Sequence, residues 1–251
     1  MAPGDPTDCF ELAAAAVGLS QRLQGPVYIA LDQALAQDSA TVPPFDLASV
    51  TLEPGKQLSA QDLAGISEYR RYRVTPDGAS PWAPAGTPGG MGLVTGNERN
   101  EWGQVSSEPR NRVAMTDKRT RKVEGLRPSL PGGRSWGNPD AQVGVIGIGM
   151  ELGPMQEASE RLAGLGMAVT WLHPRTLWPV PDETLEFIAR HERVYVVEHN
   201  AEGQLAQILR SAGASPGCLR SILRYDGLPF SAGELVARIL GDERQRAEVA
   251  S

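Results

Sequence analysis

Short apolar runs and longer runs with helical periodicity follow one another through residues 138–251. Continuous apolar stretches predict strands at residues 142–148, 167–172, 194–197 and 219–223. Helical spacing predicts helices after Gly153, at residues 182–191, at residues 203–211 and from Ser231 onwards. Because strands and helices alternate, the pattern predicts an α/β fold with a parallel sheet and right-handed crossovers.

Two of these helices have recognisable buried faces. The helix after Gly153 carries an apolar stripe at spacings of three and four, formed by Met155, Ala158, Leu162 and Leu165. In the last helix, Ser231 and Glu234 predict a capping box at the amino end. Its predicted buried face consists of Leu235, Val236, Ile239 and Leu240.

Residues 1–40 predict one helix and one strand. Asp8 and Glu11 are spaced for a capping box, residues 10–23 for a helix, and Gly25 and Pro26 for its end. Residues 27–32 form a near-continuous apolar run, which is typical of a strand buried on both faces of a parallel sheet. Two hypotheses remain open: the strand adds to the edge of the later sheet, or it is the last strand of a domain whose front half is missing. We favour the second.

Residues 41–137 are rich in proline, glycine and charge, which argues against long regular elements. Such a long irregular segment is either functional or wrapped on a partner. Residues 69–74 are a basic, aromatic strand candidate. Residues 111–125 predict a basic helix that includes Lys118 and Lys122. A solvated face is the favoured interpretation of that helix, and docking on an acidic partner or anion is the alternative.

The glycines at the end of the first predicted strand suggest a dinucleotide-binding turn. Their spacing is Gly147-x-Gly149-x-x-x-Gly153, which departs from the usual fingerprint, and the second strand ends without a carboxylate for a ribose hydroxyl. The favoured interpretation is a tight strand-to-helix turn. Its backbone amides could still hold an anion, because a helix amino end favours negative charge.

Glu198, His199, Asn200 and Gln204 follow the strand at residues 194–197 and form the stronger candidate site. The carboxyl ends of such strands are where open α/β sheets place ligand contacts. Neighbouring residues on a strand point to opposite faces, so a proton relay between Glu198 and His199 is not expected. Interface contacts, the edge of a cofactor pocket and simple loop capping remain open as roles.

Composition excludes several classes of protein. The net charge of -6 argues against a nucleic-acid partner, and no apolar run approaches the roughly 20 residues of a membrane span. The amino terminus lacks the basic start of a signal peptide, so we expect a cytoplasmic protein. Two cysteines cannot supply the four thiolates of an iron–sulfur cluster, and the three histidines show no metal-ligand spacing.

Several motifs in the three segments recur together in one family. Residues 3–11 with 22–27 match the first part of the pattern. Residues 70–74, 88–89, 95–98 and 101–103, with Met115-x-x-Lys118-Arg119-x-x-Lys122, match the second. Gly149, Glu198-x-Asn200-x-x-Gly203-Gln204 and Tyr225-Asp226-Gly227-x-Pro229 match the third. This ordered set resembles the alpha subunit of the 2-oxoacid:ferredoxin oxidoreductases, closest to the 2-oxoglutarate branch. Arg99-Asn100 stands where the family has His-Asp, so no role of that histidine is carried over.

The resemblance implies a division of the chain and a chemistry. Residues 1–40 would be the tail of a thiamine pyrimidine-binding domain, residues 41–137 a connecting segment, and residues 138–251 a transketolase C-terminal-like α/β domain. Enzymes of this family use thiamine diphosphate to decarboxylate a 2-oxoacid and form an acyl-coenzyme A. The electrons pass through 4Fe-4S clusters to ferredoxin. A beta subunit holds the diphosphate, its Mg²⁺ and a cluster, so none of these cofactors is expected on this chain alone.

The sequence is therefore interpreted as a short or truncated alpha subunit that is inactive alone. Its expected partners are the beta subunit, ferredoxin through the complex, coenzyme A and a 2-oxoacid. The family's activating glutamate lies upstream of the matching region, so we assign no catalytic residue and no metal ligand. Gly149, Glu198, Asn200 and Gln204 are the candidates for cofactor contacts. The alternatives are a stand-alone nucleotide-binding regulatory protein, and a non-catalytic scaffold or fragment.

Overall fold

The computed structural model describes residues 1–37 and 39–250, which form two compact units. Unit 1 contains Met1–Ala13, Tyr28–Asp46 and Leu130–Ser251, and unit 2 contains Ala14–Val27 and Leu47–Ser129. None of the described helices combines the length and the apolarity that crossing a membrane requires. The three-part division of the chain by family resemblance stays a prediction.

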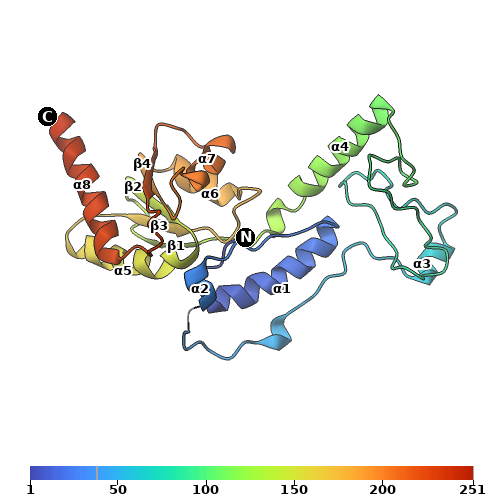
Figure 1. The fold of residues 1–251 in the computed structure, drawn as a ribbon, viewed down its shortest axis with the longest axis horizontal. Coiled ribbons are helices and arrows are strands. Elements are labelled where there is room, and N and C mark those ends of the chain that lie inside the picture. Colours follow the sequence, from blue (N-terminus) through green and yellow to red (C-terminus); the bar gives the residue numbers. More distant parts are fainter. Residues whose placement is uncertain (38, 251) are drawn as a thin grey trace. The chain divides into compact units, whose positions relative to one another are not determined.

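A five-stranded sheet forms the centre of unit 1 (Figure 1). The strands lie in the order β1-β3-β2-β4-β5; β2 to β5 run parallel, and β1 runs antiparallel beside β3. The predicted α/β fold with a parallel sheet is therefore confirmed. The strands are β1 (Arg134–Gly137), β2 (Val143–Gly147), β3 (Thr170–His173), β4 (Arg193–Glu198) and β5 (Leu219–Leu223).

Helices cover both faces of this sheet. Val145 of β2 belongs to a buried cluster that includes side chains of α5 (Leu152–Gly164) and α8 (Ala232–Ala250). The next residue, Ile146, belongs to a second cluster with side chains of α6 (Asp182–Ala189) and α7 (Gln204–Ser211). Since successive residues of a strand point to opposite faces, a strand covered on both sides must be apolar at every position. This explains why the sequence shows continuous apolar runs here.

The predicted stripe of α5 is confirmed at three of its four positions. Met155, Ala158 and Leu162 are fully buried, whereas Leu165 is 64% exposed. The prediction for Leu165 is wrong because α5 ends at Gly164, and Leu165 already lies in the turn that follows.

The capping box at the start of α8 is confirmed. The amide of Glu234 donates to Ser231 Oγ at 3.2 Å, and the amide of Ser231 donates to Glu234 Oε2 at 2.9 Å. Leu235 and Ile239 are fully buried, and Val236 and Leu240 pack against the same cluster.

The edge strand β1 lies before the expected start of the C-terminal domain at residue 138. Trp136 of β1 pairs with Trp171 of β3, and their side-chain rings stack with centroids 6.2 Å apart. Four residues ending in Gly137, at φ +92°, offer too short a pattern for a strand prediction. The sheet therefore takes its first strand from the segment that the sequence indicated as a connection.

The predicted buried strand at residues 27–32 is wrong. These residues form no strand, and Tyr28 is 78% exposed. Their backbone is held instead by Met1, whose amino group donates to the carbonyl of Tyr28 and whose carbonyl accepts from the amide of Ala30, both at 2.7 Å. The hypothesis that this run adds to the edge of the sheet is therefore also wrong. Its assignment to a pyrimidine-binding domain stays a prediction.

Helix α1 (Pro6–Leu23) starts earlier than predicted, and Asp5 rather than Asp8 caps it. The amide of Asp8 donates to Asp5 Oδ1 at 2.7 Å. Pro6 suits the first position of the helix, because proline has no backbone N–H group that would need an acceptor there. The fully buried Asp8 binds Arg134 Nη2 at 2.6 Å and Arg175 Nη1 at 3.2 Å. The first turn of α1 is thus attached to β1 and to the segment after β3.

Unit 2 is mostly irregular, as its proline and glycine content predicts. Its longest element within the unit is α4 (Pro109–Glu124), which confirms the predicted basic helix, and α3 (Ala60–Ala64) is short. The strand predicted at residues 69–74 is wrong. This segment turns, with the amide of Arg73 donating to the carbonyl of Arg70 at 3.2 Å.

Candidate functional site

Three of the residues that the sequence indicated lie where β4 leads into α7: Glu198 ends β4, Asn200 lies in the loop, and Gln204 begins α7. Glu198 is 1% exposed and accepts hydrogen bonds from the amides of Leu205, at 2.6 Å, and Ala206, at 3.1 Å. Asn200 Nδ2 also donates to Glu198, at 2.9 Å. The amide oxygen of Asn200 in turn accepts from the backbone amides of Glu202, Gly203 and Gln204.

These bonds satisfy the free amides at the amino end of α7, which is the main chemical need of that position. Glu198 and Asn200 therefore act as caps, in agreement with the loop-capping hypothesis. A carboxylate here also interacts favourably with the helix dipole. Gln204 is exposed, and its contact with a cofactor, like that of Glu198 and Asn200, stays a prediction.

Gly149 lies in the turn between β2 and α5, within the 3-10 helix η3 (Gly149–Glu151). Its φ of +64° is a left-handed conformation that favours glycine. Asp32 Oδ2 accepts from the amide of Met150 at 2.8 Å, and a Cβ on Gly149 would lie 2.5 Å from that oxygen. The tight turn is as predicted. The anion bound by a backbone amide of this turn, that of Met150, is the carboxylate of Asp32 in the same chain.

Glu151, which the sequence did not indicate, is paired with His199 in the same region. The side chain of Glu151 is 1% exposed, and its Oε1 lies 2.8 Å from His199 Nδ1. Burial raises the pKa of Glu151, and the nearby charge of Asp32 raises it further. The close contact with the Glu151 carboxylate raises the pKa of His199. Glu198 and His199 thus point to different partners, as expected for neighbours at the end of a strand.

His173, at the end of β3, is a further titratable group of this sheet edge. It is fully buried, and its Nε2 lies 3.0 Å from the carbonyl oxygen of Gly149. Burial lowers the pKa of His173, so the neutral ring is favoured. Three or more metal-ligating side chains do not gather anywhere in the described part of the chain.

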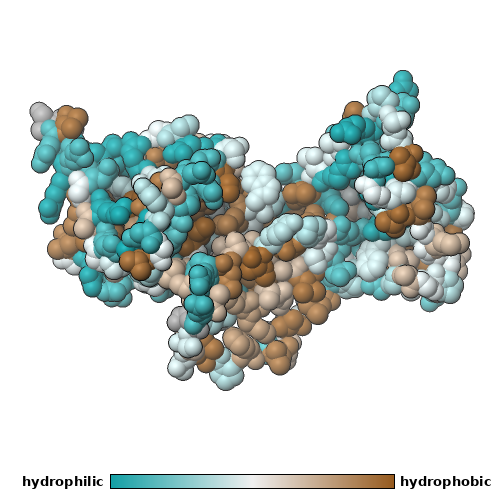
Figure 2. Space-filling model, viewed as in Figure 1, coloured by the Kyte–Doolittle hydropathy of each residue, from teal (hydrophilic) through white to brown (hydrophobic). Residues whose placement is uncertain are grey.

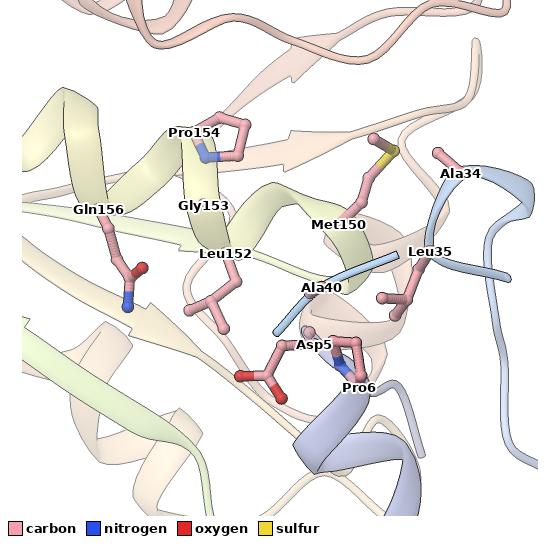
Figure 3. A pocket seen from close by; sticks show the side chains of 11 residues that line it. Asp5, Pro6, Ala34, Leu35, Ala40, Met150, Leu152, Gly153, Pro154 and Gln156 are labelled. Carbon is pink, nitrogen blue, oxygen red and sulfur yellow. The ribbon is translucent and has the colours of Figure 1, made fainter. Parts of the chain in front are cut away.

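A cavity of about 460 Å³ lies beside the turn that contains Gly149 (Figure 3). Met150 and Leu152 line it from the turn and the start of α5, Asp5 from the start of α1, and Leu35 from the short helix α2 (Gln33–Gln37). The carboxylate of Asp5 is already paired with Arg134. The remaining lining is mostly apolar, so this cavity offers room for a ligand but few polar anchors.

We expect the stability of the protein to fall as pH rises above the ordinary values of 4.5 for Glu151 and 6.5 for His199. Both pKa values are raised in the folded state, so the folded protein binds these protons more tightly than the unfolded chain does. The protons therefore stabilise the fold at low pH, and this stabilisation is lost as pH rises and the protons leave. Melting temperatures of the wild type and Glu151→Gln, measured from pH 5 to pH 8, test this. The variant should show a flatter curve.

Glu157→Gln is the matched control, because Glu157 lies on α5 with its side chain 55% exposed. Its curve should run parallel to that of the wild type. A Glu151→Gln curve that also runs parallel would contradict the assignment.

Asp32, Glu151 and His173 are the residues of this region that the sequence interpretation missed. Glu151 had a visible signal, since it is a carboxylate placed between apolar neighbours in a glycine-rich turn. His173 also had one, because it is a polar residue at the end of a predicted strand. Asp32 had none, because only the fold brings residue 32 to the end of β2.

Comparisons with known proteins give the chain its context. No family model matches it. It is 32% identical to the alpha subunit of 2-oxoacid:ferredoxin oxidoreductase 2 of Aeropyrum pernix, over 97% of this chain and 39% of that protein. It is 34% identical to the 2-oxoglutarate oxidoreductase subunit KorA of Mycobacterium tuberculosis, over 94% of this chain and 35% of that protein.

A solved structure shows the same similarity in three dimensions. It is the 2-oxoglutarate:ferredoxin oxidoreductase of Magnetococcus marinus, with 2-oxoglutarate, coenzyme A and succinyl-CoA bound. The TM-score is 0.87 at 30% identity, over 94% of this chain and 41% of that one. The chain thus spans about two fifths of the length of the proteins it matches.

Proposed function

Because the chain is a homologue of the alpha subunits of 2-oxoacid:ferredoxin oxidoreductases, we propose that it is an alpha-subunit component of such an enzyme. The resemblance inferred from its motifs is thereby confirmed. The proposed reaction converts a 2-oxoacid and coenzyme A to an acyl-coenzyme A, with release of CO2 and reduction of ferredoxin. The proposed 2-oxoacid is 2-oxoglutarate, which is supported by the names of the KorA relative and the Magnetococcus marinus enzyme.

Thiamine diphosphate, Mg²⁺ and 4Fe-4S clusters are the cofactors proposed for the whole enzyme. The side chains that the structure describes do not offer the ligands that a 4Fe-4S cluster or a Mg²⁺ ion would need. Its two cysteines, Cys9 and Cys218, cannot complete a four-thiolate set, and no cluster of three potential ligands is found among the described residues. We therefore place these groups on other parts of the complex, the beta subunit above all.

The role proposed for this chain is to supply interface and coenzyme A contacts. The carboxylate of Glu198 and the amide oxygen of Asn200 are occupied by the amino end of α7, which supports a structural role for both. The same occupation gives no support to catalysis by this chain alone. Asp32 already binds the amide of Met150, which weighs against a stand-alone nucleotide-binding protein.

Exposed apolar residues support an interface role. Tyr28, Ile29 and Leu31 are 78%, 38% and 47% exposed, within three residues of one another. Figure 2 shows apolar surface over the region that Figure 1 colours blue. Large exposed apolar patches are typical of surfaces that another protein covers.

Turnover measurements test the proposal. The purified chain, supplied with 2-oxoglutarate, thiamine diphosphate, coenzyme A and an electron acceptor, is expected to show none. Addition of a beta subunit of this enzyme family, and of any further alpha-subunit polypeptide, should give succinyl-coenzyme A formation. Turnover by the isolated chain would contradict the proposed inactivity, and tight binding of an adenine nucleotide without turnover in the complex would favour a regulatory protein.

A further inference from the structure

Helix α2 covers one side of the cavity in unit 1 that Figure 3 shows. Ala34 and Leu35 of α2 line this cavity beside Met150 of the turn and Leu152 at the start of α5. Leu35 is 9% exposed, whereas the other four residues of α2 are exposed. The helix therefore rests on the rest of unit 1 through a single buried side chain, as a lid does.

Asp32 supplies the polar attachment of this lid. Its Oδ1 accepts from the amide of Leu35 and its Oδ2 from the amide of Met150, each at 2.8 Å. One carboxylate thus caps α2 and also joins it to the turn after β2. Among the described residues, no hydrogen bond other than those to Asp32 joins residues 33–37 to the rest of the chain. An isolated helix of five residues is unstable in water, so α2 depends on this attachment.

The buried pair of Glu151 and His199 lies directly beside this attachment. Asp32 binds the amide of Met150, which is the residue before Glu151. The side chain of Glu151 is 1% exposed, and its Oε1 lies 2.8 Å from His199 Nδ1. At this distance the two groups titrate as a pair, and with one proton between them the pair has no net charge. The side chain of His199 is 28% exposed, so this proton can exchange with the solvent.

Loss of this proton leaves a buried negative charge close to the carboxylate of Asp32. Burial raises the pKa of Glu151, and the contact with Glu151 raises the pKa of His199. The charge of Asp32 raises both pKa values further, since it repels the deprotonated pair. Because such an interaction acts equally in both directions, loss of the proton weakens the attachment of Asp32 to the turn.

The other charged groups around the pair do not take the place of the proton. Arg224, just after β5, favours loss of the proton, but it is already bound to Asp226 at 2.8 Å and to Glu234 at 2.7 Å. Burial lowers the pKa of His173, which favours its neutral ring. Arg238 of α8 shares a phenylalanine neighbour with the histidine of the pair. The carboxylate at the turn is thus the negative charge that the pair acts on.

We propose that α2 is a lid over this cavity, that Asp32 is its latch, and that the shared proton of Glu151 and His199 keeps the latch closed. While the pair holds its proton, Asp32 stays on the amides of Leu35 and Met150. As pH rises above the ordinary value of 6.5 for His199 and the proton leaves, Asp32 is repelled and α2 separates from the turn. The mostly apolar cavity of about 460 Å³ then becomes accessible. The inference does not depend on the proposed function.

Hydrogen exchange of the full chain tests the latch. The protection factors of the Leu35 and Met150 amides, which correct for the intrinsic effect of pH, should fall roughly tenfold or more between about pH 6 and about pH 8.5. Glu151→Gln keeps the size of the side chain without its charge, so both amides should stay protected over this range. The amide of Leu205, which Glu198 accepts at 2.6 Å, is the internal control and should not change.

Asp32→Asn tests the latch itself. Asparagine keeps one acceptor oxygen in place of two, so at least one of the two amides should lose protection at both pH values. Asp140→Asn, an exposed change in unit 1, is the matched control and should behave as the wild type does. Equal protection of the wild type at both pH values would overturn the proposal. So would an Asp32→Asn variant that protects both amides, or a loss in Glu151→Gln as large as that of the wild type.

Methionine methyl signals in NMR spectra give a second measurement. The chain has six methionines, and Met150 is the one that lines this cavity. Its methyl signal should move with pH in the wild type and stay constant in Glu151→Gln. The signal of Met91, which lies in unit 2, is the reference. A Met150 signal that does not respond to pH in the wild type would contradict the opening of the cavity.

Discussion

Gly78→Ala is expected to destabilise unit 2 by about 2–5 kcal/mol. The φ of Gly78 is +77°, which costs an alanine about 1–2 kcal/mol. The added Cβ would also meet the backbone of α4 at the carbonyl of Lys118 and the amide of Lys122. A helix backbone cannot give way as a flexible side chain can, so the overpacking adds about 1–3 kcal/mol. Urea unfolding followed by circular dichroism measures the loss.

Gly86→Ala separates the two causes. Gly86 has a φ of +88°, but a Cβ there would meet nothing within 4 Å. This variant should therefore lose only the conformational part, about 1–2 kcal/mol. Equal losses in the two variants would mean that Gly78 does not pack tightly on α4.

The elements of unit 1 that the sequence predicted correctly depend on local signals that tertiary contacts reinforce. The apolar runs at β2 and β4 are continuous because both strands are buried on two faces. The capping box of α8 joins Ser231 and Glu234, whose spacing of three residues lets each side chain accept from the backbone amide of the other. In these places the local preference and the fold agree.

The wrong strand predictions arise where an apolar or basic run does not lie in a sheet, although its composition is typical of one. Residues 27–32 have the composition of a buried strand, but composition cannot indicate whether neighbouring strands exist to pair with it. The first cap was placed at Asp8 because Glu11 follows it at the right spacing, whereas Pro6 fixes the helix start and makes Asp5 the cap. For residues 27–32 the deciding contacts are distant in sequence, and for the cap of α1 the deciding residues lie one turn before the predicted cap.

The candidate site shows the same limit. The sequence indicated Glu198 and Asn200 by their place after a strand, and the structure confirms their place and brings them into contact. It could not indicate that Asp32 would reach the turn at Gly149, because the two are more than one hundred residues apart. Chemistry that depends on such contacts is visible only after folding.

Glu198→Ala is expected to destabilise unit 1 by about 2–4 kcal/mol, because it removes the acceptor of two buried amides, those of Leu205 and Ala206. Glu202→Ala, an exposed change in the same loop, should alter stability by no more than about 0.5 kcal/mol. Glu198→Gln should fall between them, since its side chain keeps one oxygen acceptor but turns an N–H group toward the other amide. Urea unfolding measures all three variants. An unchanged stability of Glu198→Ala would exclude the capping role, and a ligand contact would then become the better explanation of a buried carboxylate at this strand end.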